Sequence, residues 1–244
     1  MFSQAKQTAA RLALTLVLPL VLAAASGEVR KESLKIDGRQ HVYFVFVPNS
    51  PPGPSGAPLL MLLHGSGHDG LSLLDPWKEL ASKEGIVLVA PNSINPAEWQ
   101  APVDGPEPLV AIADAVRQKY AIDPKRVYLF GHSGGAAFAL LMALAKQDYF
   151  AAIAVHAAAL HPKAEPLVQE VTHKTPIQLQ VGTQDQYFPM AAVRHTRDLF
   201  AAAGFAFELK EIPQHDHNYY AISGQVNRDA WAFLKDKTLV AAPQ

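Results

Sequence analysis

The segment Gly131-His132-Ser133-Gly134-Gly135 places a serine between glycines, directly after the apolar run 127–130 and directly before an apolar, helix-forming stretch. At such a strand-to-helix turn the serine hydroxyl projects above the end of the strand, and small neighbours are needed because larger side chains would clash. The amide of Gly134, at the start of the helix, can donate to an oxyanion. The pattern therefore predicts Ser133 as the nucleophile of an acyl transfer; a glycine-rich turn without a chemical role is the alternative.

A serine hydroxyl is a weak nucleophile until a base removes its proton, and that base needs a third group to orient it. Asp185 follows the predicted strand at residues 177–181 and is the expected orienting acid, with a solvated loop aspartate as the alternative. Two histidines, His215 and His217, follow the alternating stretch that ends at Ile212. His217 is the expected base because it precedes the aromatic pair that leads toward the final helix, and His215 is the alternative.

A second amide donor for the oxyanion is expected in Leu62-Leu63-His64-Gly65-Ser66-Gly67, which also follows an apolar strand. The Ser66 amide is the favoured donor, and the Gly67 amide is the alternative. His64 is expected to hold this loop by hydrogen bonds rather than to transfer a proton. The further candidates for contact with a substrate are the side chains of His64, His132, Trp99 and Tyr187.

The histidines at positions 215 and 217 could suggest a metal site, but the sequence offers no third and fourth ligand at useful spacing. The chain has no cysteine, which excludes disulfides and a thiol nucleophile. No metal and no cofactor are therefore expected. His156, at the end of another apolar run, is a candidate either for the pocket wall or for ordinary packing.

Short, mostly apolar runs recur along the chain and predict strands covered on both faces, as in a parallel sheet between helices. These runs span residues 59–63, 86–90, 127–130, 151–155 and 177–181, and helices are expected over residues 75–85, 107–120, 135–146, 189–203 and 227–235. Asp37-Gly38 predicts a hairpin of residues 31–36 and 41–47, and the alternating stretch 205–212 predicts a strand near the sheet edge. The fold class is α/β, a mostly parallel twisted sheet with helices on both faces and an N-terminal antiparallel hairpin.

The chain has 244 residues, of which 49% are hydrophobic and 18% are charged, and its formal net charge is −1. This composition suits a single globular domain that can bury a large core. A net charge so close to zero gives no reason to expect nucleic acid or an anionic membrane surface as a partner.

The N-terminus has the features of a secretory signal peptide. A positively charged start precedes an apolar stretch over residues 12–24, and Ala23 and Ala25 form an Ala-x-Ala exit. These features predict a signal peptide over residues 1–25, cut after Ala25, with an uncleaved anchor helix as the alternative. Residues 26–244 are then expected to form one soluble domain, secreted or periplasmic and without a stable membrane anchor.

These motifs resemble those of the exported polyhydroxybutyrate depolymerase and feruloyl esterase-like branch of the α/β-hydrolases. Besides the serine turn, the resemblance rests on Leu63-His64-Gly65-Ser66-Gly67 and on Ile122-Asp123-Pro124 followed by Arg126-Val127-Tyr128. Asp216-His217-Asn218-Tyr219-Tyr220 is similar to the Asp-His-Ser-Tyr-Tyr around the catalytic histidine of esterase D-type S-formylglutathione hydrolases. Gly134 departs from the branch, which often has asparagine after the serine.

The resemblance implies the α/β-hydrolase fold, with Ser133, Asp185 and His217 as nucleophile, acid and base. It also implies that the amides of Gly134 and Ser66 bind the oxyanion. The expected function is that of an exported serine hydrolase that cleaves carboxylic esters through an acyl-enzyme.

Two other enzymes and one binding protein are the alternatives to this function. A prolyl-oligopeptidase-like peptidase or a thioesterase would use the same three residues, and a non-catalytic binding protein on a hydrolase scaffold is the remote alternative. The candidate cap segments, residues 94–108 and 161–174, are short. An open site for a small-molecule or oligomeric ester is therefore expected.

Overall fold

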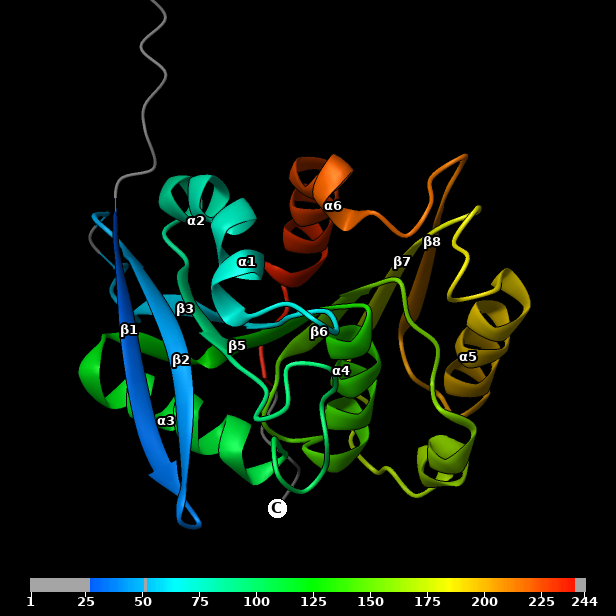
Figure 1. Ribbon diagram of the computed structural model, residues 1–244, viewed down its shortest axis with the longest axis horizontal. Helices are drawn as coiled ribbons and strands as arrows, with labels where there is room; N and C mark the ends of the chain where they lie inside the picture. The colour runs from blue at the N-terminus through cyan, green and yellow to red at the C-terminus, as the bar shows by residue number, and fades with distance from the viewer. Residues whose placement is uncertain (1–26, 51, 240–244) are drawn as a thin grey trace, which may run out of the picture.

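The computed structural model describes residues 27–50 and 52–239, and the expected signal peptide over residues 1–25 lies outside them. The strands are β1 (Gly27–Ile36), β2 (Arg39–Pro48), β3 (Ala57–Leu63), β4 (Val87–Pro91), β5 (Ile122–His132), β6 (Ala152–His156), β7 (Ile177–Gly182) and β8 (Phe207–Ile212). Within the described residues, these eight strands form one sheet in the order β1-β2-β4-β3-β5-β6-β7-β8 (Figure 1).

The sheet begins with the predicted antiparallel hairpin of β1 and β2. Asp37 and Gly38 at its tip have positive φ angles of 48° and 79°, as in the tight turns whose twist matches that of the strands. β2 pairs antiparallel with β4, and the pairings from β4 through β8 are parallel. The predicted fold class is confirmed, and β8 lies at the predicted edge although it begins at Phe207 rather than Phe205.

Separate sets of helices cover the two faces of the sheet (Figure 1). One face carries α3 (Glu107–Lys119), α4 (Gly134–Ala145) and α5 (Met190–Ala202), and the other carries α1 (Gly70–Leu74), α2 (Lys78–Glu84) and α6 (Tyr219–Leu234). The 3-10 helix η1 (Asp75–Trp77) links α1 to α2, and the 3-10 helix η2 (Pro162–Gln169) lies between β6 and β7 in the sequence. Met61 of β3 belongs to the hydrophobic core between the sheet and α4, and Leu62 belongs to the core between the sheet and α6. Because β3 is covered on both faces, it is apolar at every position. None of the helices in the described part of the chain combines the length and the apolar character needed to cross a membrane.

Helical structure begins earlier than predicted at two places. The side chain of Asp69 caps α1, because Oδ1 accepts the amide N–H of Ser72 at 2.8 Å, and this short helix precedes the predicted one. α6 begins at Tyr219 rather than at residue 227, and a kink at Ile222 separates its first turn from the rest. The sequence obscures both starts because α1 is only five residues long and the kink interrupts the helical spacing of apolar residues in α6.

Candidate active site

The turn between β5 and α4 holds Ser133 in a conformation that few residues adopt, with φ 55° and ψ −120°. A positive φ at a non-glycine residue is strained and persists only where the surrounding structure imposes it. A Cβ on Gly135 would lie 2.1 Å from the carbonyl oxygen of Leu63, and a Cβ on Gly131 would lie 2.5 Å from the carbonyl oxygen of Gly135. The glycines therefore let the start of α4 pack directly on the ends of β3 and β5, with the serine at the tip of the turn.

Three loops at the carboxyl ends of parallel strands bring Ser133, Asp185 and His217 together. Ser133 follows β5, Asp185 lies between β7 and α5, and His217 lies between β8 and α6. Nε2 of His217 is 2.9 Å from Oγ of Ser133, and Nδ1 of His217 is 2.7 Å from Oδ2 of Asp185. In this arrangement a histidine can take the proton of a serine while a carboxylate holds its ring.

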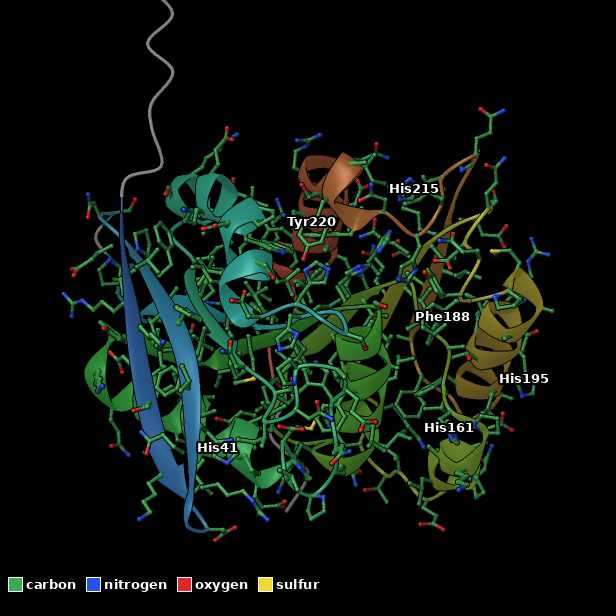
Figure 2. All side chains as sticks on the ribbon, in the orientation of Figure 1. His41, His161, Phe188, His195, His215 and Tyr220 are labelled. Atoms are coloured by element: carbon green, nitrogen blue, oxygen red, sulfur yellow. The ribbon has the colours of Figure 1, made fainter. Side chains whose placement is uncertain are left out.

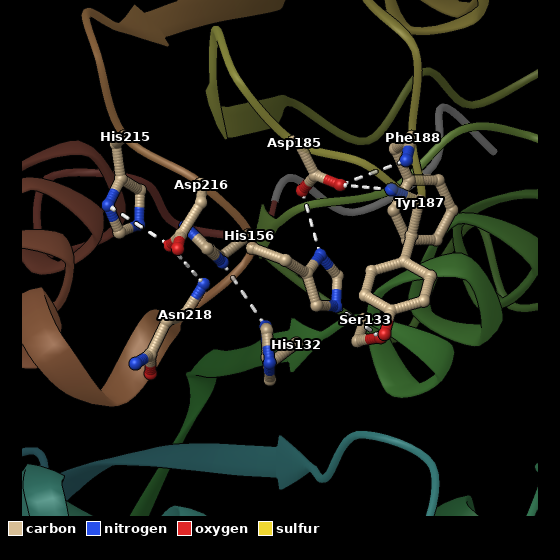
Figure 3. Close-up of polar contacts among 10 residues, drawn as sticks. His132, Ser133, His156, Asp185, Tyr187, Phe188, His215, Asp216 and Asn218 are labelled. Carbon is tan, nitrogen blue, oxygen red and sulfur yellow. Dashed lines mark hydrogen bonds and ion pairs between the residues drawn. The ribbon is translucent and has the colours of Figure 1, made fainter.

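The carboxylate of Asp185 is fixed by contacts beyond the histidine. Its side chain is 0% exposed, and Oδ1 accepts the amide N–H groups of Tyr187 at 2.8 Å and Phe188 at 2.9 Å (Figure 3). The amide of Asp185 donates to the carbonyl oxygen of Gly182 at 3.1 Å, which closes a tight turn directly after β7. These hydrogen bonds stabilise the buried charge and present Oδ2 to His217.

The loop that carries His217 is shaped by the residues around it. Oδ1 of Asp216 accepts the amide N–H of Asn218 at 2.8 Å, an Asx turn that bends the chain at the histidine. The amide of Tyr219 donates to the carbonyl oxygen of His217 at 2.9 Å. Tyr219 is fully buried, and its hydroxyl donates to Oδ1 of Asn227 at 2.7 Å. The first turn of α6 thereby anchors the loop in the core.

His215, the alternative base, lies on the same loop but in different surroundings. In Figure 3, His215 is at the left end of the group of polar side chains, and Ser133 is to the right. Nδ1 of His215 is 3.9 Å from Oδ1 of Asp216, and its buried Nε2 has no hydrogen-bond partner in the described part of the chain. Among the described residues, no group of three or more His, Asp or Glu side chains is arranged to hold a metal ion.

Gly134 and Ser66, whose amides are expected to bind an oxyanion, are neighbours beside the serine. A Cβ on Gly134 would lie 2.6 Å from Oγ of Ser66 and 3.5 Å from its amide nitrogen. Gly134 is the first residue of α4, where amide N–H groups point out of the helix. The amide of Gly67, the alternative donor, donates to the carbonyl oxygen of Pro96 at 2.7 Å. The Gly67 amide is therefore already occupied within the protein.

His64 is buried beneath the loop that carries Ser66. Its Nδ1 donates to the carbonyl oxygen of Gly65 at 2.9 Å, and its Nε2 accepts the amide N–H of Ser93 at 3.1 Å. These partners require the neutral ring. Burial also lowers the pKa of His64, which favours the same neutral form. Because the residue is 1% exposed, it cannot contact a substrate in this structure, contrary to one of the two expectations for it. Its hydrogen bonds match the other expectation, which is that it holds the loop.

A cleft of about 480 Å³ opens beside Ser133. His132 and Tyr187, two candidates for substrate contact, line it, and Tyr187 is 67% exposed. His68 and Phe188 (Figure 2) also line the cleft and were not predicted. Their only signal in the sequence is that each lies a few residues from a predicted site residue.

Trp99 lines an adjoining hollow of about 180 Å³, which shares Gly134 with the cleft. Asp104, 3% exposed, organises the loop that carries Trp99, because its carboxylate accepts two amide N–H groups of that loop at 2.7 Å. Nε1 of Trp99 donates to the carbonyl oxygen of His64 at 2.9 Å, and its ring stacks on that of Phe138. Trp99 therefore occupies a fixed position at the rim of the site.

A buried pair of histidines lies beside His217. The Nδ1 atoms of His132 and His156 are 3.1 Å apart (Figure 3), so one ring donates and the other accepts. Burial and the neighbouring His217 lower the pKa of His132 to about 3, and burial lowers the pKa of His156 well below its ordinary value. The ring of His132 lies 5.1 Å from that of His217, centroid to centroid. The pair is therefore neutral, and it does not oppose a positive charge on His217.

This neutral pair should make the protein less stable in acid. The pKa of His132 is about 3 in the folded protein, against 6.5 for an unperturbed histidine. Between these pH values the unfolded chain binds a proton that the folded chain excludes. Stability should therefore fall as the pH drops, by up to about 1.4 kcal/mol per pH unit for this one group.

Urea unfolding between about pH 7 and pH 5 measures this slope. His132→Gln should lose stability less steeply than the wild type over that range. His195→Gln changes an exposed histidine of α5 and is the matched control for a histidine-to-glutamine substitution. Equal slopes for the wild type and His132→Gln would contradict the prediction.

Residues 100–237 match the model of the dienelactone hydrolase family. The matched segment covers more than half of the chain and contains Ser133, Asp185 and His217. The chain belongs to the dienelactone hydrolase family. This membership, together with the fold, confirms the resemblance to α/β-hydrolases that the motifs predict.

Two relatives of this member of the dienelactone hydrolase family are named as an esterase and a depolymerase. A protein of Nocardia uniformis subsp. tsuyamanensis named as an esterase, NocK, is 31% identical over 143 residues, which are 53% of this chain and 42% of that protein. Poly(3-hydroxyalkanoate) depolymerase C of Paucimonas lemoignei is 26% identical over 191 residues, which are 71% of this chain and 46% of that protein. The chain thus spans less than half the length of these two relatives.

The solved structure of a CE1 ferulic acid esterase from Anaeromyces mucronatus, in complex with ferulic acid, has the same fold. It superposes on this member of the dienelactone hydrolase family with a TM-score of 0.67 and 16% identity, over 87% of this chain and 90% of that one. At this level of identity the likeness shows a shared fold.

Proposed function

We propose that the protein is a serine esterase that hydrolyses carboxylic esters, with Ser133 as nucleophile, His217 as base and Asp185 as orienting acid. The observation that carries the proposal is the line of hydrogen bonds from Asp185 through His217 to Oγ of Ser133, with distances of 2.7 and 2.9 Å. The names of the two relatives, an esterase and a poly(3-hydroxyalkanoate) depolymerase, support the same class of reaction.

The proposed reaction has two halves. Oγ of Ser133 attacks the carbonyl carbon of the ester while Nε2 of His217 takes its proton. The bond to the alcohol oxygen then breaks as Nε2 returns the proton to that oxygen, which leaves an acyl-enzyme. Water, deprotonated by Nε2 of His217, then attacks the acyl carbon. The bond to Oγ breaks as Nε2 returns the proton to Oγ, which releases the acid and restores Ser133. Asp185 stays on Nδ1 of His217 and stabilises the protonated ring.

We assign the oxyanion to the amides of Gly134 and Ser66. The two residues are neighbours in space, and Gly134 is at the positive end of the α4 dipole. Ser66 is favoured over Gly67 because the Gly67 amide donates to the carbonyl oxygen of Pro96. A single donor of this kind contributes about 10²- to 10³-fold to kcat.

Export is part of the proposal. Residues 1–25 have the charged start, apolar stretch and small-residue exit of a signal peptide. Residues 26–244 then act as one domain in the periplasm or outside the cell. The N-terminal residue of the mature protein tests this part of the proposal.

Three substrates that share one acyl group test the class of reaction. They are p-nitrophenyl butanoate, a butanoyl thioester and butanoyl p-nitroanilide, which differ in the atom that leaves. We expect the highest kcat/KM for the oxygen ester, with a burst of nitrophenol because the acyl-enzyme accumulates. Fastest turnover of the anilide would favour the peptidase, and fastest turnover of the thioester would favour the thioesterase. Absence of turnover with all three would indicate a binding protein.

A further inference from the structure

We propose that the acyl part of the substrate lies in an apolar groove along α4, which makes the protein selective for esters of medium- and long-chain aliphatic acids. The proposal rests on the esterase function proposed above and adds the substrate class. It is carried by a hollow that adjoins the cleft, by a second hollow next to the first, by the side on which the alcohol must leave and by the apolar character of the lining.

The groove begins at the cleft. Gly134, whose amide we assign to the oxyanion, lines both the cleft and the 180 Å³ hollow, which we call the near hollow. Trp99, Phe138, Leu160 and Ala164 are among the residues that form its walls. A substrate carbonyl held at Ser133 therefore borders directly on an apolar surface.

A second hollow of about 250 Å³, which we call the far hollow, lies next to the near hollow, and Leu141 lines both. Its walls include Leu144, Leu167 and Val171. The residues of α4 that line the two hollows run from Gly134 to the last turn of the helix, and a rise of about 1.5 Å per residue gives this path a length of about 16 Å. A path of this length suits an extended hydrocarbon chain better than a single aromatic ring.

The departure of the alcohol assigns the acyl part to this groove. The alcohol oxygen must receive its proton from Nε2 of His217, so the alcohol part lies where His217, Tyr187 and Phe188 line the cleft. The near hollow starts on the Gly134 side of Ser133 and extends along α4. An ester that places its alcohol at His217 therefore directs its acyl chain toward Trp99 and Phe138.

The lining of the groove is apolar over most of its length. His161 is the single titratable side chain among the lining residues of the near hollow, and Glu170 is the single one in the far hollow. Leu167 is 40% exposed, so a bound chain would cover an apolar side chain that otherwise faces water. Each fully buried methylene of such a chain is worth about fourfold in affinity.

The chain-length dependence of kcat/KM tests the proposal. The substrates are p-nitrophenyl acetate, hexanoate, decanoate and myristate, each below the concentration at which it forms micelles, with the cinnamate as an aromatic comparison. The wild type should gain up to about fourfold per methylene from acetate to decanoate. It should also hydrolyse the decanoate with a higher kcat/KM than the cinnamate.

Two variants locate the effect in the groove. Leu141→Trp fills the junction of the hollows and should lower kcat/KM for the decanoate at least about tenfold more than kcat/KM for the acetate. Leu167→Asp places a charge at the exposed rim of the far hollow and should lower kcat/KM for the myristate. Because Leu167 is exposed, this variant keeps the test valid if Leu141→Trp does not fold. Leu80→Trp, at a half-buried leucine of α2 on the other face of the sheet, is the matched control and should keep the wild-type profile.

The outcomes separate this proposal from the function on which it rests. Absence of turnover with every ester would overturn the esterase function itself. Turnover of the acetate with a flat chain-length profile, or equal profiles in the wild type and both groove variants, would overturn only the groove. A higher kcat/KM for the cinnamate than for the decanoate would overturn the aliphatic assignment.

Discussion

Replacing Ser133 by alanine is expected to lower kcat for a p-nitrophenyl ester by at least about 10³-fold. The variant loses the oxygen to which we assign the attack on the carbonyl and which lies 2.9 Å from Nε2 of His217. The oxyanion amides and the cleft remain, and these account for the small residual rate that such variants retain. Steady-state kinetics with p-nitrophenyl butanoate measure the loss, and a fluorophosphonate probe should label the wild type and not the variant.

The alanine variant is expected to fold. Alanine is an L residue with a smaller side chain than serine, so it adds no strain at φ 55° beyond that already present. Ser50→Ala, at an exposed serine that follows β2, is the matched control and should keep both the activity and the labelling. Labelling that persists in Ser133→Ala would show that another residue is the nucleophile.

The parts of the fold and site that the sequence predicts well are those that local physics determines. A strand buried on both faces is apolar at nearly every position, so runs such as 59–63 and 86–90 indicate a parallel sheet. The turn at Ser133 needs glycines because backbone atoms of β3 approach within 2.1 Å of a Cβ position. Such requirements concern a few neighbouring residues, so the residue types at those positions indicate the local structure.

The parts that the sequence does not predict depend on contacts between distant segments. The pairing of His132 with His156 follows from the register of β5 and β6, in which these two residues lie opposite each other. His68 gives no signal of its own, and it lines the cleft because the loop after β3 turns toward Ser133. The groove along α4 depends on the position of η2, which forms part of its wall. Because α4 is apolar on nearly every side, its sequence does not show which of its side chains remain uncovered.

Alanine variants of His215 and His217 show which of the two histidines is the base. We expect His217→Ala to lower kcat by at least about 10³-fold, because the serine loses the group that takes its proton. Nε2 of His217 contacts Oγ of Ser133 and Nδ1 contacts Asp185, so the variant also leaves Oδ2 of the buried carboxylate without this donor. Kinetics with p-nitrophenyl butanoate measure the loss, and the rate of fluorophosphonate labelling should fall with kcat because both reactions need the same base.

His215→Ala is the matched control, because it removes the same side chain from the same loop. The ring of His215 packs 5.7 Å from that of His156, centroid to centroid, and its Nδ1 faces Asp216, so its loss should cost stability rather than chemistry. Thermal unfolding of both variants separates the two effects: His215→Ala should unfold at a lower temperature and keep most of the wild-type kcat. The opposite result would be a low kcat for folded His215→Ala and a wild-type kcat for His217→Ala. The base would then be His215 rather than His217. The loop after β8 would then need to rearrange to bring that ring to Ser133.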